Sequence, residues 1–258
     1  MSGLKYRVVP AVASLMMVVG CQSAPVQDEV QTPEMEGVIE CYDNKAVYEQ
    51  LLFSEIGKEI AYDGYAEYGH LLTLEKIEET KEGDLVYRYH GLMNDGLGDE
   101  DGSRSFELTY TLTSDALVET IENHDEYRLY EETSLLDSII PNKVLLKGNL
   151  KTGTTWKESF EYQGQPYTAI NELTVLKTEE GATQYRVDTI VENIPDFVNH
   201  TYTETRVFEE GLGLISFTNI SPLTFFEEEY QLEYPDREFY LFGYSRSGER
   251  VFDQSSKE

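Results

Sequence analysis

The stretch "TAINELTVLKTEEGATQYRVDTIVE", residues 168–192, contains two runs of alternating apolar and polar residues on either side of a glycine-containing turn. A period of two places alternate side chains on opposite faces of a β-strand, so each run predicts a strand with one solvated face. Valine, isoleucine, threonine and tyrosine, which are favoured in strands, supply much of both runs. The stretch therefore predicts two neighbouring antiparallel strands.

The same pattern recurs along most of the chain beyond residue 60. Further alternating runs occupy residues 85–92, 105–113 and 202–209, and short segments with Gly, Asp or Asn separate them. Consecutive strands with short turns tend to pair side by side. The sequence therefore predicts a mainly β fold in which an antiparallel meander forms a curved sheet or an open half-barrel.

Helix signals are few. Residues 43–59 contain a cap-like Asp43, apolar residues at helical spacing and a glycine near the end, which together predict one short N-terminal amphipathic helix. Residues 134–141 suit a single helical turn that ends at Pro141.

Two parts of the chain share a spacing of sequence features. Residues 51–121 and 145–217 both begin at or just before a Leu-Leu pair and hold similar strand patterns at offsets of 94 to about 97 residues. We interpret them as two similar halves in tandem that join into one sheet, with Tyr62 and Trp156 at equivalent core positions. The alternative is that any two β-meanders look alike at this level of detail.

The N-terminus has the layout of a signal peptide. Lys5 and Arg7 precede an uncharged apolar stretch, residues 8–20, that is too short to span a bilayer as a mature helix. Its end, Val-Val-Gly-Cys at residues 18–21, resembles the lipobox of bacterial lipoproteins. This resemblance implies that Cys21 is acylated and anchors the chain to a membrane. The alternative is an ordinary secretory signal with an incidental cysteine.

These features suggest the domain boundaries. Residues 1–20 form the signal peptide, and residues 21–41, which are polar, acidic and proline-containing, form a flexible tether. Residues 42–252 form a single β domain, and residues 253–258 form a disordered tail. Since Gln22 is not aspartate, the lipobox resemblance implies the outer membrane if the host is Gram-negative.

The composition is strongly acidic. The 258 residues carry a formal charge of −29, which becomes −31 when the signal peptide and its two positive charges are removed. This charge excludes nucleic acid as a partner, because a protein that binds nucleic acid must neutralise phosphate, and it disfavours docking on anionic lipid head groups. Acidic residues interleave with aromatic and aliphatic ones, so they predict a solvated surface over a β core.

The sequence contains no common motif for catalysis or cofactor binding. The four histidines are scattered, and HExxH, GxSxG, P-loop and dinucleotide motifs are absent, so we expect no catalytic residue and no cofactor. The densest set of oxygen ligands, Asp95, Asp99 and Asp101, lies in residues 94–103, where the spacing fails the EF-hand pattern. We interpret this segment as a solvated hairpin loop and predict no tight calcium site there.

Cys41 is one of only two cysteines. If Cys21 is acylated, Cys41 has no partner for a disulfide within the chain. A free thiol at the edge of the folded domain is the simplest interpretation, and an intermolecular disulfide or a metal contact is the alternative.

The second half resembles a family of uncharacterised bacterial envelope lipoproteins. The shared features are a Leu-Leu pair, Gly-Thr-x-Trp, and an aromatic residue followed by Gly-hydrophobic-Gly-hydrophobic. They are carried here by Leu145, Leu146, Gly153, Thr154, Trp156, Phe208, Gly211, Leu212, Gly213 and Leu214. The first half fits more loosely through residues 62–69, whereas Asn149 and residues 178–181 depart from the family's pattern. The resemblance implies an envelope lipoprotein and brings no catalytic residue.

Several of these residues also have a structural interpretation. Trp156, the only tryptophan, follows a turn at Gly153, and we expect its ring to be buried with the indole N–H paired at a sheet edge. Gly211 and Gly213 flank Leu212 in a segment that must turn or let another backbone approach closely. We expect core and turn roles at these positions rather than ligand binding.

The function that these observations favour is a lipid-anchored envelope lipoprotein with a non-enzymatic role in binding or envelope assembly. The alternative is a carrier of apolar or lipid ligands, because a curved meander can enclose a concave β cavity. A third interpretation is an enzyme with a site assembled from scattered residues. The partners are the membrane, through the N-terminal lipid, and either an envelope protein or an apolar ligand.

Acylation of Cys21 can be tested directly. We expect a palmitate analogue to label the wild-type chain in cells and to leave Cys21→Ser unlabelled, because the thiol is the acceptor of the lipid. Gel fluorescence after conjugation measures the label, and the variant Cys41→Ser is the matched control that keeps it. Equal labelling of wild type and Cys21→Ser would contradict the prediction.

Overall fold

The computed structural model describes residues 43–64, 69–94, 105–122, 138–220 and 241–250. All of them lie in one compact unit, Glu40–Glu258. The described residues form one α-helix, one 3-10 helix and twelve strands. The elements are α1 (Lys45–Gln50), β1 (Glu59–Gly64), β2 (Gly69–Glu79), β3 (Leu85–Asn94), β4 (Ser105–Leu112), β5 (Ala116–Glu122), β6 (Lys143–Lys147), β7 (Thr154–Tyr162), β8 (Gln165–Lys177), β9 (Thr183–Glu192), η3 (Val198–His200), β10 (Thr201–Glu209), β11 (Gly213–Ile220) and β12 (Leu241–Arg250).

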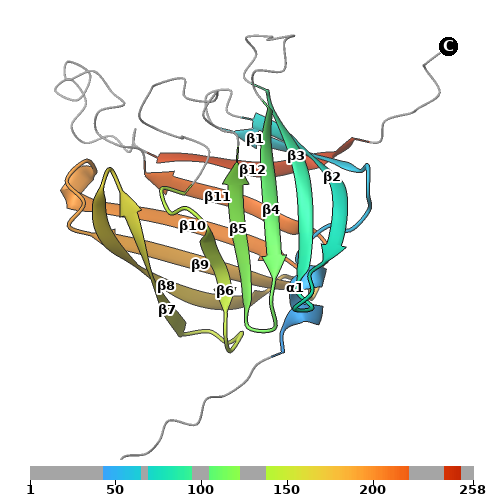
Figure 1. Ribbon diagram of the computed structural model, residues 1–258, viewed down its shortest axis with the longest axis horizontal. Coiled ribbons are helices and arrows are strands. Elements are labelled where there is room, and N and C mark those ends of the chain that lie inside the picture. The colour runs from blue at the N-terminus through green and yellow to red at the C-terminus, as the bar shows by residue number, and fades with distance from the viewer. Residues whose placement is uncertain (1–42, 65–68, 95–104, 123–137, 221–240, 251–258) are drawn as a thin grey trace, which may run out of the picture. The chain divides into compact units, whose positions relative to one another are not determined.

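The twelve strands form one antiparallel sheet in the order β6-β5-β4-β3-β2-β1-β12-β11-β10-β9-β8-β7. Each strand from β1 to β6 pairs with its neighbour in the chain, and so does each strand from β7 to β12. The first and last strands, β1 and β12, join the two runs. The sheet curls until it is nearly closed, so that β4 and β5 pass in front of β9 to β11 (Figure 1).

The prediction of a mainly β, antiparallel, curved fold with one short helix is confirmed. The alternating runs within residues 168–192 are β8 and β9, which pair over nine consecutive residue pairs from Ala169↔Val191 to Lys177↔Thr183. The strands within residues 51–121 and 145–217 follow the same sequential order, β1 to β5 and β7 to β11. Tandem duplication itself stays a prediction.

The helix is shorter than predicted. α1 covers only Lys45–Gln50 and begins after Asn44, so the prediction of a helix over residues 43–59 capped by Asp43 is wrong in extent. The helical turn predicted for residues 134–141 is not supported either, because its last four residues, which are the described ones, contain no helix.

Pairing with the sheet explains why the helix ends early. The Gly57 N–H donates to Leu74 O at 2.8 Å, and β1 begins two residues later and pairs with β2. Gly57 has φ +81, a left-handed conformation that favours glycine and does not fit within a helix. Ile56, which the helical pattern placed on the buried face, is 62 % exposed.

The helix covers one end of the curled sheet. Tyr48 is fully buried and donates its hydroxyl hydrogen to Asp115 O at 3.0 Å, while the Gly211 N–H donates to Gln50 O at 2.8 Å. At Gly213, φ is +84 and a Cβ atom would lie 3.2 Å from the Leu51 carbonyl oxygen. The turn between β10 and β11 therefore needs glycine both for its backbone conformation and for the close approach of the helix end.

Side chains at alternate positions along the strands point inward and fill the interior. On β4 the burial alternates strictly, and the inward positions include Leu108 and Tyr110. The main apolar cluster extends from α1 along most of the strands, and a second cluster, which includes Phe160, Phe197 and Tyr202, lies around η3. None of the helices among the described residues has the length and apolarity to cross a membrane.

Side chains rather than a backbone ladder bridge the seam between the two ends of the sheet, β6 and β7. The Trp156 Nε1–H donates to Val144 O at 3.2 Å, and the Val144 N–H donates to Glu158 Oε2 at 3.0 Å. Both backbone groups of this β6 residue are thereby satisfied by β7 side chains. The Trp156 ring is 8 % exposed, and its N–H is paired at a sheet edge.

The seam makes Trp156 a test of the fold. We expect Trp156→Ala to lower the free energy of unfolding by about 3–5 kcal/mol, because it removes a large buried ring and its bond across the seam. We expect Trp156→Phe to cost less, since it keeps one aromatic ring in the core and loses the N–H bond and only part of the buried volume. Urea unfolding followed by circular dichroism measures both, and Lys157→Ala, at the exposed neighbouring position, is the control. A Trp156→Ala cost no larger than that of Lys157→Ala would contradict this account of the core.

Candidate functional site

A row of polar side chains crosses the interior of the second half. The register places Trp156 opposite Asn171, Asn171 opposite Thr189, Thr189 opposite Glu204, and Glu204 opposite Asn219. Each of these residues is 8 % exposed or less. Strands β7 to β11 therefore place one continuous, mostly polar row of side chains in the buried interior, where most side chains are usually apolar.

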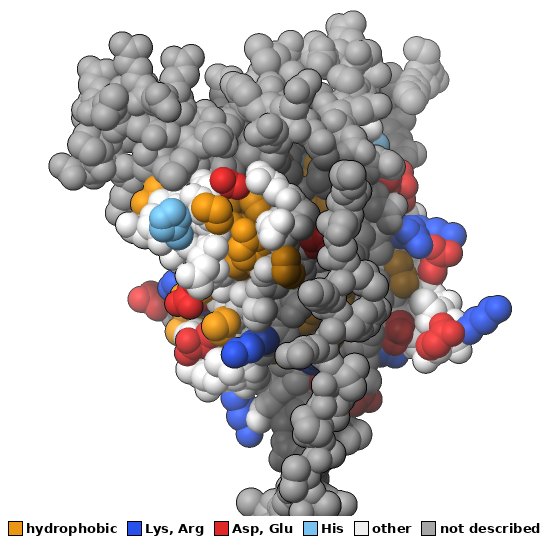
Figure 2. Space-filling view, turned by 60° about the vertical axis from the view of Figure 1, so that its left-hand side comes forward, with side chains coloured by type: hydrophobic (Ala, Val, Ile, Leu, Met, Phe, Trp, Pro, Cys, Tyr) orange, Lys and Arg blue, Asp and Glu red, His pale blue; other side chains and the backbone are white. Residues whose placement is uncertain are grey.

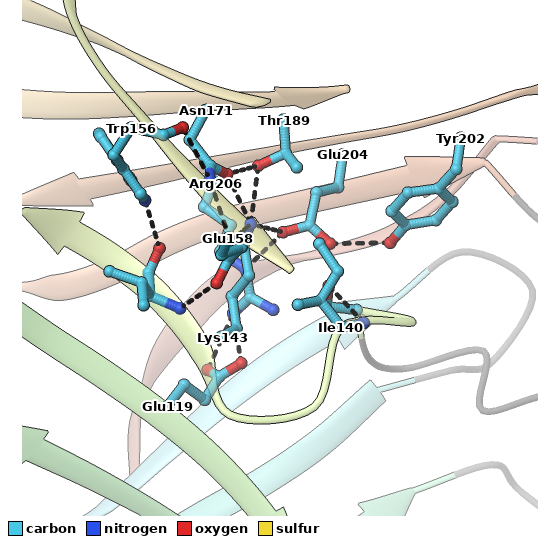
Figure 3. A network of polar contacts seen from close by, with 12 residues as sticks. Glu119, Ile140, Lys143, Trp156, Glu158, Asn171, Thr189, Tyr202, Glu204 and Arg206 are labelled. Atoms are coloured by element: carbon cyan, nitrogen blue, oxygen red, sulfur yellow. Dashed lines mark hydrogen bonds and ion pairs between the residues drawn. The ribbon is translucent and has the colours of Figure 1, made fainter. Parts of the chain in front are cut away.

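Five charged side chains gather at this row (Figure 3). Lys143 Nζ lies 2.6 Å from Glu158 Oε1 and 3.7 Å from Glu204 Oε1. Arg206 Nη1 lies 2.8 Å from both carboxylate oxygens of Glu119, and its Nε lies 3.5 Å from Glu204 Oε1. Side-chain exposure ranges from 1 % for Lys143 to 10 % for Glu158. We call these five residues the ion network.

The network contains two cations and three carboxylates in a dry interior. Burial raises the pKa of Glu204, but the nearby Lys143 and Arg206 more than offset this and hold the pKa below its ordinary value. Tyr202 donates to Glu204 Oε2 at 2.7 Å, and burial and this carboxylate raise the pKa of its phenol. The Arg206 guanidinium also lies 4.6 Å from the centre of the Phe217 ring. Such pairing is what makes buried charges tolerable.

The network connects parts of the sheet that are distant in the chain. The Arg206–Glu119 pair joins β10 to β5 across the interior, and Lys143 joins β6 to β7 and β10. The three donor hydrogens of the Lys143 ammonium have three hydrogen-bond acceptors, namely Glu158, Asn171 at 2.6 Å and Thr189 at 3.1 Å.

A second buried polar group, His70, lies at the joint between the two halves. Its ring stacks on Tyr62 at 4.6 Å and meets Tyr244 and Phe106 edge-on at 4.6 and 5.8 Å. Among the described residues its Nδ1 has no hydrogen-bond partner. Burial lowers the pKa of His70 to about 3, so the ring is neutral at physiological pH.

Phe106 reaches His70 because Gly91, on the strand between them, has no side chain. A Cβ atom at Gly91 would lie 2.2 Å from the Phe106 ring, so the ring occupies the space that a side chain would need. The three residues lie on neighbouring strands, β2, β3 and β4. The glycine thus allows an aromatic ring to cover the strand beside it.

The structure describes only some of the residues that the sequence singled out as structural or functional. Gly153, Gly211 and Gly213 have φ near +85 and form turns. Cys21, Cys41, Asp95, Asp99 and Asp101 lie outside the described residues. Among the residues that the structure does describe, no group of three or more His, Cys, Asp or Glu side chains is arranged to hold a metal ion.

The ion network was not predicted from the sequence. A signal was present in β10, where Glu204 and Arg206 share the phase of Tyr202 and Phe208, while the opposite phase holds only Thr, Val and one terminal Glu. Charged residues in phase with large aromatic ones indicate a polar interior when the aromatic phase is the buried one. The partners Lys143 and Glu119 come from other strands and gave no comparable signal.

Comparisons with known proteins assign no family. No family model matches the chain, and no curated protein matches it. A Bacteroides fragilis structure, provisionally described as an exported protein with a YMCC-like fold, matches with a TM-score of 0.41 and 7 % identity over 78 % of this chain and 99 % of its own. A Parabacteroides distasonis structure, provisionally described as a lipoprotein, matches with a TM-score of 0.40 and 8 % identity over 76 % and 96 %. At these values neither similarity assigns a function to the chain.

His70 predicts a pH dependence of stability. The unfolded chain binds a proton below the ordinary histidine pKa of 6.5, whereas the folded chain does so only near pH 3. Stability is therefore present above pH 6.5 and is lost as the pH falls through this window, by about 2 kcal/mol between pH 7 and pH 5. We expect His70→Phe to remove this loss.

Urea unfolding at pH 7 and pH 5 measures the effect. The lowered pKa of Glu204 affects stability only at lower pH, so the window isolates the histidine. His200→Asn is the control, because His200 is exposed and should leave the pH dependence unchanged. The same loss of stability in His70→Phe as in wild type would show that His70 is not the group responsible.

Proposed function

We propose that the chain is a lipid-anchored component of the bacterial cell envelope with a non-enzymatic role in binding or assembly. The signal peptide and the lipobox-like Val-Val-Gly-Cys sequence support the anchor. The acidic, proline-containing segment after Cys21 suits a spacer between the membrane and the folded domain. In this proposal the β domain is a rigid module that offers its outer surface to a partner.

We choose the outer surface as the binding site because side chains fill the interior. Large inward-facing rings such as Tyr89, Tyr110 and Phe208 are at most 4 % exposed, and the ion network occupies the middle of the second half. An apolar ligand placed there would have to lie against charged groups and displace their partners, which is costly in a dry interior. The ion network therefore disfavours the carrier of apolar ligands and favours binding outside.

The outer surface provides positions for testing this. Charged side chains of both signs surround a small apolar area on the described part of the face in Figure 2. Ile170 and Ile190 lie directly opposite each other on the solvated phase of β8 and β9 and are 41 % and 44 % exposed. An exposed pair of this kind is a suitable site for a reporter of surface contact.

The proposal predicts a contact that depends on the anchor. A photo-crosslinking amino acid at Ile190 should give a defined adduct with an envelope protein in cells, and Cys21→Ser should abolish it because the domain is no longer held at the membrane. The same reporter at Lys81, an exposed turn residue of the other half, is the matched control. Mass spectrometry identifies the adduct.

Native mass spectrometry of the purified protein separates the two main candidates. Binding on the outer surface predicts the mass of the lipidated chain alone. A further lipid molecule bound in stoichiometric amount would favour the carrier instead and contradict the proposal.

A further inference from the structure

Three side chains of the ion network and its row form an unusually close set across the seam. Lys143 on β6, Glu158 on β7 and Asn171 on β8 meet at one point (Figure 3). Lys143 Nζ lies 2.6 Å from Asn171 Oδ1 and 2.6 Å from Glu158 Oε1, and Asn171 Nδ2 lies 3.0 Å from the same Glu158 oxygen. A single carboxylate oxygen thus contacts both an amine and a side-chain amide that contact each other.

The hydrogen bonds fix the orientation of the amide. Asn171 Nδ2 donates to Glu158 and, at 3.5 Å, to the Trp156 carbonyl oxygen, so its nitrogen points at acceptors. Asn171 Oδ1 accepts from the Thr189 hydroxyl at 2.7 Å and from Lys143. The amide carbonyl is polarised by two donors, and its carbon is one bond away from the atom that the lysine nitrogen contacts.

The surroundings suit a reaction of the lysine. Asn171, Lys143 and Thr189 are at most 1 % exposed and the Glu158 side chain is 10 % exposed, so the site is almost fully buried. The Glu158 carboxylate lies 2.6 Å from Lys143 Nζ, where it can accept a proton from the ammonium. Loss of that proton leaves an amine, which is a nucleophile, with its nitrogen 2.6 Å from the amide oxygen of Asn171.

We propose that Lys143 and Asn171 form an intramolecular isopeptide bond, with Glu158 as the catalytic acid and base. Glu158 takes a proton from the Lys143 ammonium, and the Nζ lone pair attacks Asn171 Cγ. The Thr189 hydroxyl donates to the oxyanion that develops on Oδ1.

The second half of the reaction releases ammonia. Glu158 delivers a proton to Nδ2, the Cγ–Nδ2 bond breaks, and Nδ2 leaves as ammonia while the new Nζ–Cγ amide retains one hydrogen. The remaining proton departs with ammonia as ammonium. The primary amide and the amine become a secondary amide, so the reaction is not a redox step and needs no cofactor.

The bond would close the sheet covalently. It would join β6 to β8 over β7, at the seam where β6 and β7 have no backbone ladder between them. In the structure the three side chains are hydrogen-bonded to one another. This inference does not rest on the proposed binding role.

Intact mass spectrometry of the full chain carrying Cys21→Ser, which removes the lipid, tests the proposal. We expect a mass about 17 Da below that of the sequence, equal to the loss of one ammonia. Lys143→Arg keeps the cation without a competent nucleophile, and Glu158→Gln keeps the shape without the base, so both should have the full mass. Lys157→Arg, at the exposed neighbouring lysine of β7, should keep the loss.

Peptide mapping then locates the bond. After digestion, a fragment that contains Lys143 should be joined to the fragment that contains Asn171, and tandem mass spectrometry should assign the link to these two side chains. A parent chain at its full mass overturns the proposal, whether or not the variants fold. A loss of ammonia at Asn171 without a link to Lys143 overturns it as well.

Discussion

Closure of the sheet depends on how β6 and β7 are held together without a backbone ladder. An exposed strand edge presents unpaired N–H and C=O groups, which are a liability in any β protein. Here Trp156 and Glu158 on β7 reach across to both backbone groups of Val144, and Lys143 continues the connection into the interior. Two side chains on alternate positions of one strand thus replace part of a ladder, and the row that crosses β8 to β11 supports them.

The same row makes the fold specific to one register. A shift of one residue in β10 would place Glu204 and Arg206 on the outer face and bring Thr203 and Thr205 inward, leaving Lys143 without one carboxylate partner. Buried ion pairs add little to stability against an apolar core, but removal of one partner is costly. The network therefore disfavours shifted strand registers. This matters because many strands of the sheet share a similar alternating pattern.

Different interactions hold the two places where the halves of the sheet meet, β1 with β12 and β6 with β7. Between β1 and β12 a backbone ladder with one irregularity, between Ala61 and Tyr62, is covered by an aromatic group in which Tyr62, His70 and Tyr244 pack together. Between β6 and β7 the hydrogen bonds come from side chains and not from a backbone ladder. Both solutions fill the interior, and the polar one also brings an amine, an amide and a carboxylate into contact.

The fold class could be predicted from the sequence, because the period of two in runs such as residues 183–192 is a local property that sets which side chains share a face. The burial of the single tryptophan also follows from the sequence. The end of the helix was not readable, since pairing of β1 with β2 overrides the helical spacing around Ile56. The pairing of β1 with β12 and the contact between Lys143 and Asn171 could be seen only in the folded structure. Both join residues that are far apart in the chain, and such contacts arise from the curvature and closure of the sheet, which no local sequence pattern encodes.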